Sequence, residues 1–205
     1  MRFYPDHIPD WFSNLLPKYV WHGDRNKRTV YLTFDDGPTP MITDFVVEQL
    51  AIHDFKATFF LIGDRAQRFP AVKQRLIDAG HHLGNHTHHH LNAWKVDTKE
   101  YLDNIAFAKA NTSSSLFRPP YGKITPTISK NLRANGYRII LWDVLSGDFD
   151  AKRSPYSCLQ ALKKHTKNGS VVVFHDSEKA FPILKVILPQ YLEWLIENGY
   201  KSALF

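Results

Sequence analysis

Short apolar runs alternate with longer amphipathic stretches along this chain of 205 residues. The runs are rich in β-branched and aromatic residues and are bounded by Gly, Pro, Asn or Asp, a pattern typical of strands. About seven runs qualify, at 28–34, 57–62, 82–85, 115–117, 137–143, 170–174 and 200–205. Because strands that alternate with helices form parallel sheets covered by helices, the pattern predicts an α/β fold.

The amphipathic stretches carry helix start and stop signals. Three pairs of residues have the expected N-terminal chemistry: Thr39 with Pro40, Ser154 with Pro155, and Asp97 with Glu100 at the start of a helix over 98–110. Gly80 and Gly136 lie where two helices should end. With no internal repeat, low-complexity tract or linker, we expect residues 1–205 to form one domain.

Two adjacent carboxylates end the first apolar run. Residues 30–34 are mostly β-branched or aromatic, and Gly37 and Pro38 stop the strand directly after Asp35 and Asp36. Alone, these residues are also typical of an ordinary turn, but α/β folds keep their chemistry at the carboxyl ends of strands. Because successive strand residues point to opposite faces, the acids should have different tasks unless the backbone turns between them. We expect one to bind a metal ion and the other to transfer protons.

A cluster of histidines follows the third apolar run. Neutral imidazole is a common ligand for zinc and similar ions, and His86 and His90 are four residues apart, which places them on one face of a helical turn. With Asp36 they make a two-histidine, one-carboxylate site with open positions for water and substrate. The other histidines of the segment compete for the same role: His81, His82, His88 and His89.

Three further polar residues stand at the ends of apolar runs. Arg118 precedes two prolines, and its planar, permanently charged guanidinium suits the orientation of a carboxylate such as Asp35. Asp148 and His175 follow later runs. Each alone fits a surface ion pair, a loop cap or an edge histidine. Their common placement at strand ends instead indicates one site.

These segments resemble the motifs of the polysaccharide deacetylase family, the family 4 carbohydrate esterases that share a homology domain with rhizobial chitooligosaccharide deacetylases. Thr33-Phe-Asp-Asp-Gly-Pro38 resembles the first motif, and His86-Thr-His-His-His90 resembles the second, a His-(Ser/Thr)-x-x-His pattern. Arg118-Pro-Pro-Tyr121 is similar to the third motif, and Val173-Phe-His175 to the fifth. The resemblance covers roughly residues 28–205.

The resemblance implies a metal-dependent hydrolase that removes acetyl groups from N-acetylated or O-acetylated sugars. It implies that Asp35 is the general base, that Asp36, His86 and His90 hold the metal, and that Arg118 orients the base. The metal would be one divalent ion, zinc first, with cobalt or nickel as alternatives. The implied fold is a distorted, incomplete (β/α) barrel of about seven parallel strands.

The same resemblance assigns the remaining site residues. His175 would be the general acid, supported by Asp148, and the backbone amide of Tyr121 would help to bind the oxyanion. The fourth motif departs from the family. Many members carry an acid where this chain has Leu145 and a tryptophan where it has Phe149, which puts one substrate contact in doubt.

Residues 1–27 are expected to form an N-terminal arm. Met1 to Gly23 contains no continuous apolar stretch, so we expect neither a signal peptide nor a membrane span there. The arm is expected to close the bottom of the barrel by packing four apolar side chains against it: Trp11, Phe12, Leu15 and Trp21. The single Cys158, expected in a helix, excludes an internal disulfide and is compatible with a cytoplasmic location.

Charge changes this picture little. Lys and Arg outnumber Asp and Glu by 26 to 20, but they are scattered, without the interleaved aromatic residues of a nucleic-acid surface. We therefore expect an acetylated carbohydrate as the partner, and no nucleic acid. Two other functions remain: an esterase or amidase on a non-carbohydrate substrate, and a catalytically silent carbohydrate-binding protein. The polymer and the oligomeric state stay open.

Overall fold

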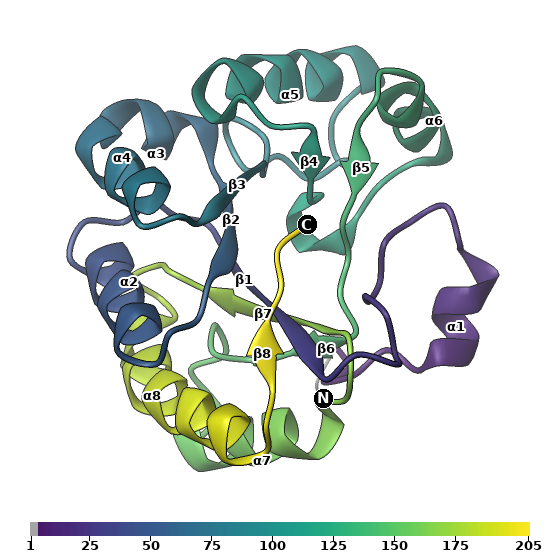
Figure 1. The fold of residues 1–205 in the computed structure, drawn as a ribbon. Coiled ribbons are helices and arrows are strands. Elements are labelled where there is room, and N and C mark those ends of the chain that lie inside the picture. The colour runs from purple at the N-terminus through teal and green to yellow at the C-terminus, as the bar shows by residue number, and fades with distance from the viewer. Residues whose placement is uncertain (1–3) are drawn as a thin grey trace.

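Parallel strands curl into an open half-barrel with helices on its outer face (Figure 1). The structure, a computed structural model, describes residues 4–205. Seven strands follow the order β5-β4-β3-β2-β1-β7-β6, and β8 pairs with the first residues of β1. The strands are β1 Thr29–Asp35, β2 Ala57–Leu61, β3 His82–Asn85, β4 Leu116–Phe117, β5 Arg138–Ile139, β6 Val144–Leu145, β7 Ser170–His175 and β8 Lys201–Ser202. The predicted distorted barrel is confirmed.

The core forms around β1, which lies between β2 and β7. Phe34 is in register with Phe59 on one side and Phe174 on the other, and the ring centroids are 5.0 and 5.5 Å apart. All three side chains are fully buried. The same register sets Asp35 beside His175. The packing of the central strands therefore brings two predicted site residues to neighbouring strand ends.

Helices connect the strands and cover the barrel. Their bounds are α1 Asp10–Leu15, α2 Ile42–Ile52, α3 Gly63–Arg68, α4 Pro70–Asp78, α5 Thr98–Thr112, α6 Pro126–Ala134, α7 Pro155–His165 and α8 Phe181–Glu197. Pro120–Gly122 is a short 3-10 turn. In the described part of the chain, no helix is both long and apolar enough to cross a membrane.

Most of the predicted helix boundaries agree with the structure. The side chains of Asp97 and Ser154 accept hydrogen bonds from backbone amides at the starts of α5 and α7. The start predicted at Thr39 is wrong, because α2 begins at Ile42 and the Thr39 amide instead donates to the hydroxyl of Thr43, inside the helix. A buried Cys158 lies in α7, as expected.

The apolar run 137–143 does not form one strand as predicted. Its first part is β5, which pairs with β4, whereas β6 follows the run and pairs with β7 on the other side of the barrel's gap. Within the gap, the Val20 amide donates to the carbonyl of Ile139, and the Leu141 amide donates to the carbonyl of Val20. The run is apolar because it crosses the buried space between β5 and β6, the two edges of the sheet. There Val20 of the N-terminal arm supplies the backbone hydrogen bonds that a neighbouring strand would otherwise make.

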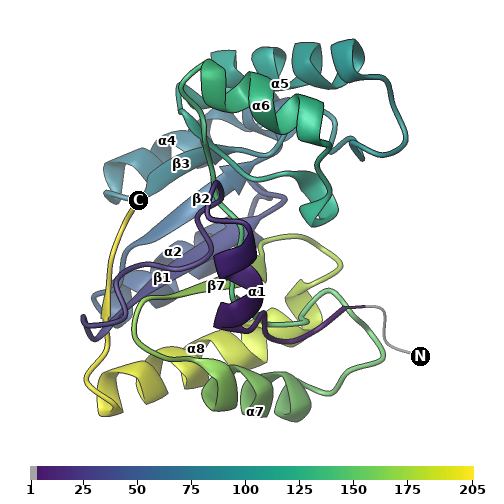
Figure 2. The ribbon, with the colours of Figure 1, turned by 90° about the vertical axis from the view of Figure 1, so that its right-hand side faces the viewer.

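The arm fills the open side of the barrel rather than its bottom. Figure 2 shows α1 between the pair α5 and α6 and the pair α7 and α8. The predicted packing of Trp11 and Leu15 is wrong, since these side chains are 67% and 68% exposed. Phe12 is also exposed, and its ring contacts Trp21, which is partly buried.

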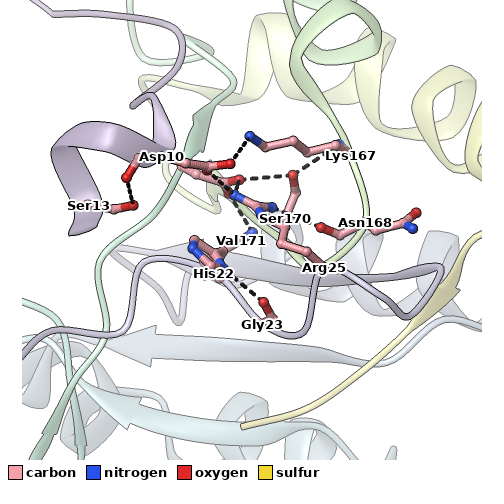
Figure 3. Close-up of polar contacts among 10 residues, drawn as sticks. Asp10, Ser13, His22, Gly23, Arg25, Lys167, Asn168, Ser170 and Val171 are labelled. Atoms are coloured by element: carbon pink, nitrogen blue, oxygen red, sulfur yellow. Dashed lines mark hydrogen bonds and ion pairs between the residues drawn. The ribbon is translucent and has the colours of Figure 1, made fainter. Parts of the chain in front are cut away.

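Ion pairs, rather than apolar packing, hold this part of the arm. Arg25 and Lys167 each contact the Asp10 carboxylate at 2.7 Å (Figure 3). Arg25 also contacts the buried carboxylate of Asp143 at 2.9 Å. The Asp143 carboxylate also accepts a hydrogen bond from the amide of Val171 in β7. This buried carboxylate thereby adds a side-chain connection between the arm and the sheet to the backbone hydrogen bonds of Val20.

Candidate active site

A cavity of about 630 Å³ lies at the carboxyl ends of the strands. Six predicted site residues line it: Asp35, Asp36, His86, His90, Tyr121 and His175. Arg118 and Asp148 are fully buried and contact this lining from behind. The structure therefore brings together the eight residues to which the sequence and the family resemblance assign a role in the site.

The two adjacent acids both face the cavity because the chain turns between them. Asp36 has φ 79, a left-handed conformation that is rare for residues other than glycine. Gly37 is needed directly afterwards, since a Cβ at that position would overlap the carboxylate of Asp176. Asp35 therefore points to Arg118, while Asp36 points to the histidines.

Asp36, His86 and His90 form a candidate metal centre. Their ligand atoms all lie within 4.8 Å of one another. Asp36 Oδ1 lies 3.2 Å from His90 Nε2 and 3.7 Å from His86 Nε2. This oxygen is buried, and within residues 4–205 it has no hydrogen bond of ordinary geometry. A buried anionic oxygen that faces two imidazole nitrogens fits a divalent cation.

The protonation of His86 also fits a metal ligand. Its Nδ1–H donates to the backbone carbonyl of Arg118 at 2.8 Å, which leaves the lone pair of Nε2 toward Asp36. Burial lowers the pKa of His86 to about 4, against the opposing charges of Asp35 and Asp36. The imidazole is therefore neutral at neutral pH, as metal binding requires.

The two histidine ligands do not lie on a helical turn as predicted. Residues 86–90 form an irregular bend in which Thr87 has φ 63 and His90 has φ 55. Asn85, at the end of β3, accepts a hydrogen bond from the Thr87 amide at 2.9 Å. Two left-handed residues, rather than helical periodicity, bring His86 and His90 together.

The competing histidines lie outside the metal centre. Asn104 in α5 accepts hydrogen bonds from the amides of His88 and His89, which fixes the outer side of the bend. His81 contacts the amide of Ala57 below the site, and His82 contacts the C-terminal residue. Of the histidines in this segment, only His86 and His90 belong to the ligand group found in residues 4–205.

Asp35 is held by a buried guanidinium. Arg118 Nη1 donates to Asp35 Oδ1 at 2.7 Å and to the hydroxyl of Thr33 at 2.8 Å. Its other nitrogens donate to the carbonyls of Ile140 and Leu141. Because every contact is made inside the protein, the guanidinium cannot swing away, and the orientation of Asp35 is fixed.

His175 and Asp148 form a second oriented pair. His175 Nδ1 lies 2.8 Å from Asp148 Oδ1, and the His175 amide donates to Asp148 Oδ2 at 2.9 Å. Burial opposes the positive charge on His175, but the charge and hydrogen bond of Asp148, helped by Asp36 and Asp35, outweigh it and raise the pKa to about 9. His175 therefore carries a proton at neutral pH.

Tyr121 lines the cavity beside His90 in a strained backbone conformation. It has φ 61 and ψ 9, and its ring centroid is 4.7 Å from that of His90. A left-handed residue other than glycine costs about 1–2 kcal/mol, and such strain gathers at functional sites. The oxyanion role of its amide stays a prediction, which this local strain supports.

Sequence reasoning missed two residues around the cavity. Asp176 is fully buried between Gly37 and the hydroxyl of Thr43. Burial, together with the charge of Asp36, raises the pKa of Asp176 to about 8, although the hydrogen bond from Thr43 opposes this shift. Its position next to His175 at a strand end was the available signal. Tyr4 lines the cavity from the arm, and no local pattern pointed to it.

Comparison with known proteins gives consistent matches. A family model described as polysaccharide deacetylase matches residues 22–140. A peptidoglycan-N-acetylglucosamine deacetylase of Bacillus cereus is 32% identical over 188 residues, covering 89% of this chain and 88% of the relative.

Solved structures agree with this match. A peptidoglycan N-acetylglucosamine deacetylase in complex with 4-naphthalen-1-yl-N-oxidanyl-benzamide has a TM-score of 0.89 at 28% identity, covering 97% of this chain and 95% of that one. A family 4 carbohydrate esterase pseudoenzyme from Bacillus anthracis has a TM-score of 0.77 at 26% identity, covering 93% and 70%.

Proposed function

Since the chain belongs to the polysaccharide deacetylase family, we propose that it removes the N-acetyl group from N-acetylglucosamine residues of peptidoglycan. One observation carries the proposal: a candidate metal centre, a carboxylate held by arginine and an imidazole held by a carboxylate meet around one cavity. Hydrolysis of an acetamide needs these three groups together.

Asp36, His86 and His90 would hold the metal ion. The donor set of two imidazoles and one carboxylate suits zinc, and we propose zinc as the native ion, with cobalt or nickel able to replace it. When bound, such an ion polarises the acetyl carbonyl and lowers the pKa of a water from 15.7 to about 7.

Asp35 and His175 divide the proton transfers. Asp35, which Arg118 keeps oriented, accepts the proton of the attacking water. The Tyr121 amide donates to the developing oxyanion. His175, protonated through its contact with Asp148, gives its proton to the amine as the carbon–nitrogen bond breaks. An amine leaves poorly without that proton, so the acid is as necessary as the base.

The rival functions differ in what they require. A silent carbohydrate-binding protein needs neither a base nor an acid, and the oriented pairs of Asp35 with Arg118 and of His175 with Asp148 would serve no purpose in it. An esterase or amidase on another substrate would use the same groups, because they recognise the acetyl group and not its carrier. The resemblance to peptidoglycan deacetylases favours the amino sugar.

Acetate release tests the proposal directly. The protein would be incubated with peptidoglycan, chitooligosaccharides and acetylated xylan, after chelation and again after addition of zinc or cobalt. We expect metal-dependent release that is fastest on peptidoglycan, and none from the Asp36→Asn variant. Faster release from xylan would replace the amide assignment with an ester one, and no release from any substrate would favour the silent binding protein.

The proposed substrate also bears on location. Peptidoglycan lies outside the cytoplasmic membrane, so the proposal places the working protein there. The sequence alone instead predicted a cytoplasmic location. Cell fractionation followed by immunodetection distinguishes the two locations.

A further inference from the structure

We propose that Tyr4 and Phe149 form a platform that binds a second sugar ring, the neighbour of the one being deacetylated. The two rings come from separate parts of the chain, the N-terminal arm and the segment after β6, and both line the cavity. Their centroids are 4.9 Å apart with an angle of 52° between the planes. The inference rests on the proposed function, because it places a carbohydrate chain in this cavity.

The platform lies on the side of the cavity where the sugar must extend. His175 gives its proton to the nitrogen that joins the acetyl group to the sugar, so the sugar lies beside His175. The centroid of the Phe149 ring is 5.0 Å from that of His175, and the centroid of the Tyr4 ring is 4.9 Å from that of Phe149. A chain whose acetamide reaches the metal centre therefore continues over Phe149 toward Tyr4.

Tyr4 is held in place before any ligand binds. Its hydroxyl donates to Asp150 Oδ2 at 2.7 Å, and burial together with the Asp150 carboxylate raises its pKa to about 12, so the hydroxyl remains a donor. The Leu145 amide donates to the carbonyl of Asp6, and Arg153 contacts the Asp6 carboxylate at 2.7 Å. Because the platform is already fixed, its side chains lose little conformational freedom when a ligand binds, which favours affinity.

The chemistry of the surface suits a pyranose ring. Such a ring presents C–H groups on its faces and hydroxyl groups at its edge, so it packs on aromatic rings while it hydrogen-bonds outward. Leu145 and Val173 continue the apolar surface toward the metal centre. Lys179 also lines the cavity, with its ammonium 5.8 Å from the Phe149 ring, and supplies a donor at the edge.

Kinetics with two substrates test the platform. Tyr4→Ala should lower the ratio of kcat/KM on a tetramer of N-acetylglucosamine to kcat/KM on a small aryl acetate by roughly three- to tenfold, mainly through KM. Tyr4→Phe keeps the ring and should restore the ratio to within about twofold. Tyr156→Ala, which removes a 73% exposed tyrosine on α7, is the matched control and should leave the ratio unchanged.

A binding measurement separates this inference from the proposed function. In the Asp35→Asn background, titration calorimetry with the tetramer should show a dissociation constant that Tyr4→Ala raises by the same factor as the KM. If the tetramer binds but the wild-type protein releases no acetate, the proposed function fails while the platform stands. An equal loss on both substrates in Tyr4→Ala would mean that Tyr4 only positions His175 through Phe149. That result, or absence of tetramer binding, overturns the platform.

Discussion

The metal side and the acid side of the cavity are built in different ways. On the metal side, Asp36 follows β1, and His86 and His90 follow β3, which β2 separates from β1 in the sheet. Left-handed residues within these short motifs orient the three side chains. On the acid side, His175 ends β7, but its surroundings come from the segment after β6 and from the arm. The metal side is therefore built from short local motifs, whereas the acid side is assembled from segments that lie far apart in the sequence.

The largest expected effect comes from breaking the metal side. His86→Ala and His90→Ala should each lose stoichiometric metal after dialysis, with turnover lowered by more than about 10³-fold, because two ligands cannot hold the ion against water. His82→Ala is the matched control, since His82 is exposed, lies outside the ligand group and contacts the backbone carbonyl of Phe205. Full metal occupancy in the two ligand variants, by elemental analysis, would refute the assignment and direct attention to His88 and His89.

The two adjacent acids should separate metal binding from proton transfer. Asp35→Asn should keep the metal and lose about 10²–10⁴-fold in turnover, because an amide cannot accept the proton of the attacking water. Asp36→Asn should lose both metal and turnover. Zinc content and acetate release are measured in both variants. Equal metal affinity in the two would contradict the assignment of metal binding to Asp36 and proton transfer to Asp35.

On the acid side, His175→Ala should cost about 10²–10⁴-fold on an amide and much less on an activated aryl ester, whose phenolate leaves without a proton. Activity should also fall as the pH rises through about 9, where His175 loses its proton, and the variant should lack this limb. The pH profiles of kcat/KM on both substrates check this. Equal relative losses on amide and ester would make His175 structural.

Asp148→Asn should have a smaller effect on the acid side than His175→Ala. Without the carboxylate, burial lowers the pKa of His175, so the alkaline limb should move to lower pH while the metal content is unchanged. The shift is read from the pH profile of the variant against that of the wild-type protein. A profile that keeps its alkaline limb would show that another group sets it.

The smallest expected effect concerns Leu145, which lines the cavity where many relatives carry an acid. Leucine cannot accept a hydrogen bond from a sugar hydroxyl, so turnover of chitooligosaccharides should be weak, and Leu145→Asp should change it by less than about tenfold. Rates on chitotetraose and peptidoglycan measure this preference. High turnover of chitotetraose that Leu145→Asp leaves unchanged would show that the position carries no specificity.

The sequence predicted the metal side well because its information is local. Asp35 and Asp36 end an apolar run, and the central strands are long enough to be recognised by their composition. The turn at Asp36 was not predictable, since a left-handed aspartate depends on the fit of Gly37 against Asp176.

The acid side and the arm were harder to predict. The two-residue strands β5 and β6 have no periodicity of their own, so one continuous apolar run concealed the gap between them. The apolar residues Trp11 and Leu15 suggested hydrophobic packing, yet both are exposed, and Arg25 holds this part of the arm through an ion pair with the buried Asp143. Contacts between segments more than 100 residues apart leave no pattern in either segment.

The register that sets Asp35 beside His175 fixes the distance between the backbones of these two residues. Neighbouring parallel strands are about 4.8 Å apart, a spacing that backbone hydrogen bonds impose on every sheet. The residues proposed to accept and to donate the proton are thus spaced by the peptide backbone and not by loops, which vary more readily. Changes in loops or in the arm can alter which polymer is bound, while the interval between the two proton-transfer groups stays the same.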